Sequence, residues 1–165
     1  MQRSLLAGLL AAKAVFASEA CSCDTNNEYY VKDLPELVDG QVQPCSYAGT
    51  MASNADGSHQ LFFWMFPSED PDAPVAIWLN GGPGASSSFG LFLENGPLVI
   101  KEPSKGSFEV YANDNTWAKA ATTIFIDQPV GTGFSYGDSF VNNLDDAASE
   151  FVTLLTNLWE EFECL

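Results

Sequence analysis

Basic residues are scarce in this chain of 165 residues. Lysine and arginine together number 6 against 22 aspartates and glutamates, which gives a net charge of −16 at pH 7. A charge of this sign disfavours nucleic acids and anionic membranes as partners. Its simplest role is to keep the protein soluble, and an acidic compartment would relieve the self-repulsion.

Long hydrophobic runs and glycosylation signals are missing as well. After the N-terminal segment no apolar run is long enough to span a bilayer. No Asn-x-Ser/Thr sequence occurs, so we expect no N-linked glycan. The hydrophobic content of 46% and the aromatic content of 13% nevertheless predict a folded chain. A length of 165 residues is short for a complete α/β domain, which often has roughly 200–250 residues.

Histidine and cysteine are few. Cys21 and Cys23 resemble half of a metal site, but the chain has one histidine and no second close cysteine pair. We therefore predict no zinc site and no other metal or cofactor. In an oxidising compartment Cys21, Cys23, Cys45 and Cys164 would form disulfides. The sequence leaves their connectivity and the oligomeric state open.

The N-terminus has the layout of a targeting segment. Arg3 precedes the apolar residues 5–12, and small residues follow at Ala17 and Ala20. This order is typical of a secretory signal peptide, here residues 1–20, and a short buried helix is the alternative. A signal peptide predicts the secretory pathway, with an extracellular or vacuolar/lysosomal destination for residues 21–165.

Hydrophobic patterns predict an α/β protein with an N-terminal β-hairpin, central strands and flanking helices. Four strands are predicted, at residues 46–51, 60–66, 75–79 and 122–126, with a turn at 54–57 and a short helix at 86–93. The last element is an amphipathic helix with Asn143 as its N-cap and Asp145 and Asp146 in its first turn. Its expected apolar positions are Leu144, Ala147, Ala148, Phe151, Leu155, Leu158, Trp159 and Phe162.

The most informative segment is residues 77–84, Ile-Trp-Leu-Asn-Gly-Gly-Pro-Gly, where a strand ends in a glycine-rich loop. Glycines permit positive φ and close approach of a ligand to the backbone, and proline stiffens the loop. Exposed amides on a stiff loop can hold an oxyanion or a carboxylate. A plain turn between a strand and a helix is the alternative interpretation.

Two long motifs make the chain resemble the serine carboxypeptidases, which have the α/β-hydrolase fold. The first is residues 77–84 followed by Gly-Leu-Phe-Leu-Glu-Asn-Gly-Pro at 90–97. The second is Phe-Ile-Asp-Gln-Pro-Val-Gly-Thr-Gly-Phe-Ser-Tyr at 125–136. The resemblance extends over residues 46–162 and implies the N-terminal part of such a domain, with an incomplete sheet.

The resemblance also implies roles for individual residues. Asn80 and the backbone of Gly81 would bind the terminal carboxylate of a peptide, and the amide of Gly82 would be an oxyanion-hole donor. Glu94 would complete the carboxylate site when protonated, because a neutral acid donates a hydrogen bond whereas an ionised one repels the ligand. A surface or capping role is the alternative for Glu94. Trp78 would wall the pocket for the departing residue, or belong to the core.

A nucleophile is not evident in the chain. Ser135 fits the G-x-S-x-G pattern, but neither a strand leading straight into it nor a following helix is predicted, so we interpret it as structural. His59 precedes every candidate serine and is expected to be an exposed turn residue. Asp127, at a strand end, is interpreted as part of the structural motif. The family usually has a cysteine where this chain has Ala85, so the loop should depend on packing alone or on another cysteine.

The expected activity is that of a serine carboxypeptidase, which hydrolyses the C-terminal peptide bond through an acyl-enzyme and acts on peptide or protein C-termini. This chain would carry the carboxylate and oxyanion half of the site, without nucleophile, acid or histidine. One alternative is an acyltransferase on the same scaffold, which would pass the acyl group to an alcohol. The other is a truncated, non-catalytic product.

Overall fold

The computed structural model describes residues 23–162 and 164–165, so the predicted signal peptide lies outside the described part. The larger sheet has the strand order β1-β2-β6-β3, and the short strand β7 also pairs with β2. Its strands are β1 (Tyr47–Ala52), β2 (His59–Phe66), β6 (Thr122–Asp127), β3 (Val75–Trp78) and β7 (Tyr136–Gly137). β1, β6 and β7 run antiparallel to β2, and β3 runs parallel to β6, so the sheet is mixed.

The predicted N-terminal hairpin is confirmed. β1 and β2 pair antiparallel from Tyr47 opposite Met65 to Ala52 opposite Gln60. Gly57 closes the turn with φ of 74°, and its N–H donates to the Asn54 carbonyl at 3.2 Å. Glycine is suited to this position because other L-residues are strained at positive φ.

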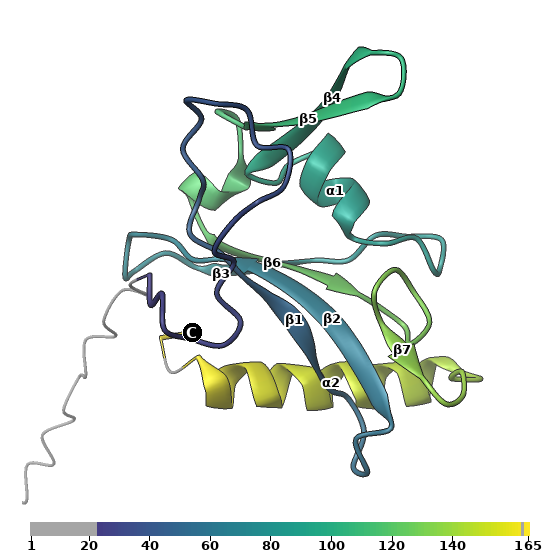
Figure 1. The fold of residues 1–165 in the computed structure, drawn as a ribbon. Coiled ribbons are helices and arrows are strands. Elements are labelled where there is room, and N and C mark those ends of the chain that lie inside the picture. Colours follow the sequence, from purple (N-terminus) through teal and green to yellow (C-terminus); the bar gives the residue numbers. More distant parts are fainter. Residues whose placement is uncertain (1–22, 163) are drawn as a thin grey trace, which may run out of the picture.

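β6 forms the centre of the molecule, and all of its residues are buried. Ile124 and Ile126 point to one face of the sheet and Phe125 to the other, as the two-residue period of a strand requires. Helix α2 (Leu144–Glu161) packs on the first face and α1 (Ser88–Leu93) on the second (Figure 1). The predicted α/β class, with helices flanking an incomplete sheet, is confirmed.

The core-facing side of helix α2 is largely the expected one, since Phe151, Leu155, Leu158 and Phe162 pack in the core cluster, but it differs from the prediction at Leu144, Leu154 and Trp159. The side chain of Asn143 caps it as predicted, by accepting from the Asp146 N–H at 2.8 Å. Leu144 is 86% exposed and Trp159 is 40% exposed, whereas Leu154 is completely buried. The sheet covers the stripe through Leu154, Leu158 and Phe162, and Leu144 lies beyond the edge of this contact.

One of the expected central strands lies at an edge, and one hairpin was not predicted. The strand β3 is only half-buried, because it lies at the edge of the described sheet with β6 as its one neighbour. A second hairpin, β4 (Leu98–Ser104) with β5 (Ser107–Ala112), was not predicted. It forms a two-stranded sheet beside α1 at the top of Figure 1, next to a 3-10 helix at Trp117–Lys119.

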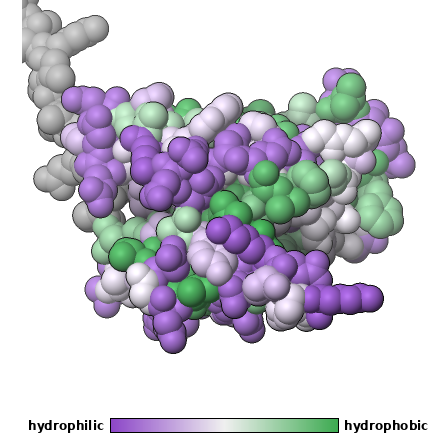
Figure 2. All heavy atoms as spheres, turned by 90° about the horizontal axis from the view of Figure 1, so that it is seen from above, coloured by the Kyte–Doolittle hydropathy of each residue, from purple (hydrophilic) through white to green (hydrophobic). Residues whose placement is uncertain are grey.

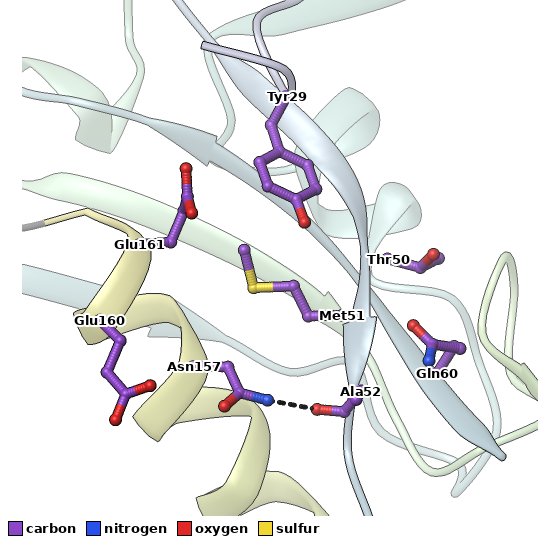
Figure 3. A pocket seen from close by; sticks show the side chains of 8 residues that line it. All are labelled: Tyr29, Thr50, Met51, Ala52, Gln60, Asn157, Glu160 and Glu161. Carbon is purple, nitrogen blue, oxygen red and sulfur yellow. Dashed lines mark hydrogen bonds between the residues drawn. The ribbon is translucent and has the colours of Figure 1, made fainter. Parts of the chain in front are cut away.

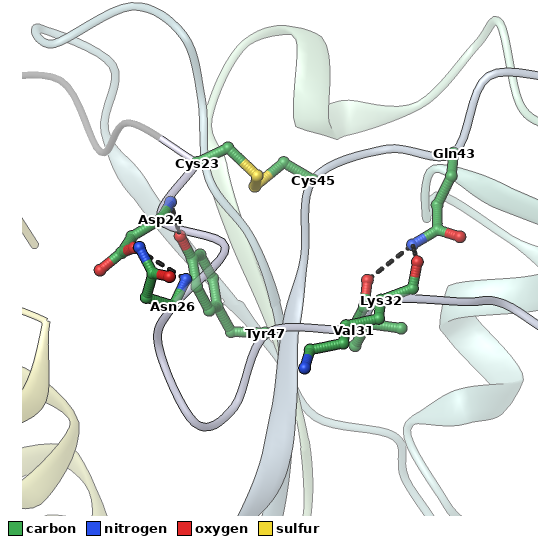
Figure 4. The surroundings of a disulfide bond; sticks show 8 residues. All are labelled: Cys23, Asp24, Asn26, Val31, Lys32, Gln43, Cys45 and Tyr47. Atoms are coloured by element: carbon green, nitrogen blue, oxygen red, sulfur yellow. Dashed lines mark hydrogen bonds between the residues drawn. A yellow bond between two sulfur atoms is a disulfide. The ribbon is translucent and has the colours of Figure 1, made fainter.

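The N-terminal segment is fastened to the hairpin beneath it. Cys23 forms a disulfide with Cys45, and the Asp24 N–H donates to the Tyr47 hydroxyl at 2.7 Å (Figure 4). Farther along, the Gln43 side chain donates to the Val31 carbonyl at 2.7 Å. The contact with Tyr47 holds this otherwise irregular segment against β1, and the other two connect parts of the segment to each other.

The face seen in Figure 2 is largely hydrophilic, in keeping with the high net charge, and apolar side chains form a band across it. Among the helices of the described residues, none combines the length and the apolar character that a membrane span requires. Exposed apolar side chains include Phe89 and Leu93 of α1 and Phe134 after β6.

Candidate functional site

The glycine loop joins the end of β3 to the start of α1 and is exposed from Gly81 to Ala85. Gly82 and Gly84 have φ of 133° and 100°, so both positions require glycine. No hydrogen bond within the described part of the chain occupies the N–H of Gly81 or Gly82. The loop therefore presents free backbone donors to solvent, as an anion site needs.

Asn80 is fixed at the base of this loop. Its Oδ1 accepts from the Trp78 indole N–H at 2.7 Å and from the Gly90 N–H at 3.2 Å. Because both donors face the same atom, they identify it as the amide oxygen. The Nδ2 group has no partner among the described residues, so its two donors remain available to a ligand.

Trp78 supports Asn80 from the core side. It is half-buried and packs edge-to-face against Trp117, with 5.7 Å between ring centroids. A Cβ at Gly90 would overlap the Trp78 indole, so glycine is needed there for the ring to reach Asn80. The indole also lines a cavity of about 10 Å³ between β3, β6 and Trp117. The structure thus places Trp78 as a support for Asn80, which the sequence did not indicate.

Glu94 lies at the other end of α1 and is exposed. Its N–H donates to the Gly90 carbonyl at 3.1 Å, whereas the Gly90 N–H donates to Asn80. The peptide groups of Gly90 therefore connect Asn80 to the end of α1 that carries Glu94. The Glu94 carboxylate makes no hydrogen bond in the described structure.

The loop is tethered by a carboxyl group in place of a disulfide. Asp127 Oδ1 accepts from the Ser87 N–H at 2.7 Å and from the Ser86 hydroxyl at 2.8 Å. Its Oδ2 accepts from the Phe134 N–H at 3.0 Å. This chain has Ala85 where the family usually has a cysteine. Hydrogen bonds to Asp127 hold the loop, and not packing alone or another cysteine. The run of serines after the glycines was the signal that sequence reasoning overlooked.

Ser135 is buried under the same junction, with 4% of its surface exposed. Its hydroxyl donates to the Asp127 carbonyl at 2.6 Å and accepts from the Phe62 N–H at 2.8 Å. Both contacts fasten the connection after β6 to the sheet. A hydroxyl engaged in this way, with no imidazole beside it, is placed to support the fold.

The prediction that His59 is an exposed turn residue is wrong. His59 is the first residue of β2 and is 7% exposed. Its Nδ1 lies 2.5 Å from Glu150 Oε1 on α2, and its Nε2 lies 3.2 Å from Asp138 Oδ1 and 3.0 Å from the Ser139 hydroxyl. The hydrogen bond with Glu150 raises the pKa of His59 above its usual value, although burial opposes this.

A shallow groove of about 400 Å³ separates β1 from the C-terminal end of α2 (Figure 3). Asn157 Nδ2 donates to the Ala52 carbonyl across it at 2.8 Å, and Glu160 and Glu161 lie on its helical side. The groove is remote from the glycine loop in sequence and in fold. Within the described residues, no group of histidine, cysteine or acidic side chains is arranged to hold a metal ion.

Known proteins resemble this chain in sequence. The serine carboxypeptidase family profile matches residues 35–164. The chain is 42% identical over 120 residues to a carboxypeptidase Y homolog of Arthroderma benhamiae, across 72% of this chain and 24% of the relative. It is 39% identical over 165 residues to the pheromone-processing carboxypeptidase KEX1 of Komagataella phaffii, across 96% of this chain and 26% of the relative.

A solved structure agrees with the fold. The crystal structure of KEX1(delta)p, a prohormone-processing carboxypeptidase from Saccharomyces cerevisiae, superposes with a TM-score of 0.69 at 31% identity. The alignment covers 82% of this chain and 33% of that one. The chain spans about a quarter of the length of the curated relatives that it matches. Its mixed sheet, its glycine loop and the match over residues 35–164 lead to one conclusion: the chain belongs to the serine carboxypeptidase family.

Proposed function

We propose that this chain supplies the carboxylate-binding and oxyanion-binding part of a serine carboxypeptidase. The complete enzyme would hydrolyse the last peptide bond of peptides and proteins through an acyl-enzyme. The nucleophile, its acid and its histidine would come from residues that this chain does not contain. The observation that carries the proposal is the orientation of Asn80, whose Oδ1 is held by two donors while Nδ2 is left free.

In the proposed complex the Asn80 amide and the Gly81 N–H donate to the terminal carboxylate of the peptide. The Gly82 N–H donates to the oxyanion that develops on the scissile carbonyl. A protonated Glu94 would add a third donor to the carboxylate, and an ionised Glu94 would repel it.

The proposed compartment follows from the disulfide and the net charge. The disulfide between Cys23 and Cys45 fits passage through an oxidising compartment. An extracellular or vacuolar/lysosomal location would suit a protein with a net charge of −16, because an acidic compartment would relieve its self-repulsion. Detection of the secreted or vacuolar protein, with its N-terminus sequenced after Ala17 or Ala20, would support this route.

A free carboxylate on the ligand should be required for binding. In NMR titrations of the full chain, N-acetyl-Phe-Ala is expected to shift the amide resonances of Gly81 and Gly82, and its C-terminal amide is not. Asn80→Asp keeps the acceptor that faces Trp78 and Gly90 but turns the free donor into an acceptor. Affinity should therefore fall at least about tenfold, or ~1.4 kcal/mol.

Asn142→Asp is the matched control, because it changes the net charge equally at an exposed position before α2. It should bind like the unmodified chain. Equal affinity for the acid and amide forms of the ligand, or an unchanged affinity in Asn80→Asp, would contradict the proposed function.

Ser135→Ala should affect stability and not catalysis. The variant leaves the Phe62 N–H and the Asp127 carbonyl without a partner, which should cost about 1–3 kcal/mol in urea unfolding. Neither the unmodified chain nor the variant should hydrolyse a blocked dipeptide. Turnover by the unmodified chain that Ser135→Ala abolishes would make Ser135 the nucleophile and refute its structural assignment.

A further inference from the structure

Asp127 occupies a closed polar junction beneath the glycine loop. It is 1% exposed, and its carboxyl group accepts from three donors on two different loops. No lysine or arginine forms an ion pair with it in the described part of the chain. Its role is therefore to orient N–H and O–H groups, not to neutralise a cation.

The junction leaves no space beside the carboxyl group. Gly133 has φ of 54°, and a Cβ there would overlap the Asp127 carboxyl and come within 2.9 Å of the Ser86 hydroxyl. The loop after β6 thus closes around the Asp127 carboxyl group next to Ser86. This close contact and the three hydrogen bonds fix the orientation of the carboxyl group.

Ser87 connects the fixed Asp127 carboxyl group to the backbone of Asn80. Its N–H donates to Asp127, and its hydroxyl donates to the Ile126 carbonyl at 2.5 Å. The same hydroxyl accepts from the Asn80 N–H at 3.1 Å. Ser87 is 1% exposed, so its hydroxyl has no competing water. The backbone of Asn80 is consequently set by the end of β6.

We infer that Asp127 and Ser87 are positioning residues for the carboxylate-binding amide of Asn80. The inference rests on the proposed function. Trp78 and Gly90 determine which way the Asn80 side chain faces, and Ser87 determines where its backbone lies. Loss of either constraint would move the free Nδ2 donors away from the ligand without removing them.

Two variants of the full chain test this inference with N-acetyl-Phe-Ala and its C-terminal amide as ligands. Ser87→Ala removes the hydroxyl that holds Asn80. Asp127→Asn keeps the shape of the side chain but opposes an N–H group to one of its three donors. Each is expected to lower the ratio of acid to amide affinity at least fivefold. Hydrogen exchange of the Asn80 N–H should accelerate, and the Trp78 indole N–H resonance should shift.

Ser53→Ala is the matched control, because Ser53 is also 1% exposed and its hydroxyl has no partner among the described residues. It should leave all three readings unchanged. An unmodified chain that prefers the acid ligand, together with variants that keep this preference, overturns the inference. An unmodified chain that shows no preference for the acid ligand refutes the proposed function. In that case the inference is tested by the Trp78 indole resonance and the exchange of the Asn80 N–H. If neither changes in Ser87→Ala, the inference fails as well.

Discussion

Replacement of Leu154 by alanine is expected to lower the free energy of unfolding by about 2–5 kcal/mol. Leu154 is completely buried in the cluster between α2 and the sheet, where it packs with Phe63, Ile124 and Leu158. Truncation removes apolar contacts and leaves a cavity, because β2 and β6 cannot move toward the helix. The loss is large beside the ordinary stability of a domain, ~5–15 kcal/mol.

The same helix provides the control for this measurement. Leu144 is also a leucine of α2, but it is 86% exposed, so Leu144→Ala should change the stability by no more than ~0.5 kcal/mol. Urea unfolding followed by far-UV circular dichroism would measure both variants. Equal losses from the two substitutions would contradict the burial of Leu154 and the exposure of Leu144.

Leu144 shows why part of the predicted apolar face is wrong. Apolar residues recur at three- and four-residue spacings along the helix, and this pattern predicts a helix without regard to its surroundings. Which part of a broad apolar stripe becomes buried depends on where the sheet ends. The sheet covers Leu154 and Leu158 and leaves Leu144 and Trp159 in solvent. The helix and most of its buried side were therefore predictable, and the extent of its contact with the sheet was not.

The hairpin formed by β4 and β5 was missed for a local reason. Its first strand contains Lys101, Glu102 and Pro103, which are all exposed. Proline and consecutive charges are uncommon in strands other than edge strands, so the sequence pattern gave no strand signal. The two strands are stabilised by each other and by the cluster that includes Leu98 and Val110.

The candidate site, too, is only partly predictable from the sequence. The glycine loop, Asn80 and Glu94 are proposed as site residues on the basis of adjacent residues in the sequence. The partners that orient Asn80 could not, because Gly90 is ten residues away and Asp127 acts from a different strand. Hydrogen bonds of this kind depend on how β3, β6 and α1 meet. Only the tertiary structure specifies how these three elements pack against one another.

The stability of the chain should fall as the pH rises through the titration of His59. The pKa of His59 is raised, first by its hydrogen bond with Glu150 and also by the charges of Glu150 and Asp138, against the opposing effect of burial. A group whose pKa is raised on folding contributes stability that is complete below its unfolded value, near ~6.5, and is lost above the folded value. Thermal unfolding between pH 5 and pH 9 should show a melting temperature that decreases by several degrees.

Several charged groups face His59, and all of them are acidic. Glu150 approaches from α2 and Asp138 from the segment after β7, and Asp56 acts on it from the hairpin turn. The Glu150 side chain is 10% exposed, whereas that of Asp138 is 72% exposed. Since a solvated partner contributes less than a buried one, Asp138→Asn should have a small effect and Glu150→Gln a large one.

His59→Gln isolates the titration from other groups. It should reduce stability at pH 5 by about 3–5 kcal/mol, because Glu150 stays buried without its charged partner. One Glu150 oxygen already lacks a hydrogen-bond partner in the described structure. The variant should also lose most of the pH dependence between pH 6 and pH 9. A melting temperature that rises over this interval, or one that falls equally in His59→Gln, would show that the pair does not fasten α2 to β2. The direction of this pH dependence bears on the proposed location. A protein whose folded state is most stable when His59 is protonated is suited to an acidic compartment.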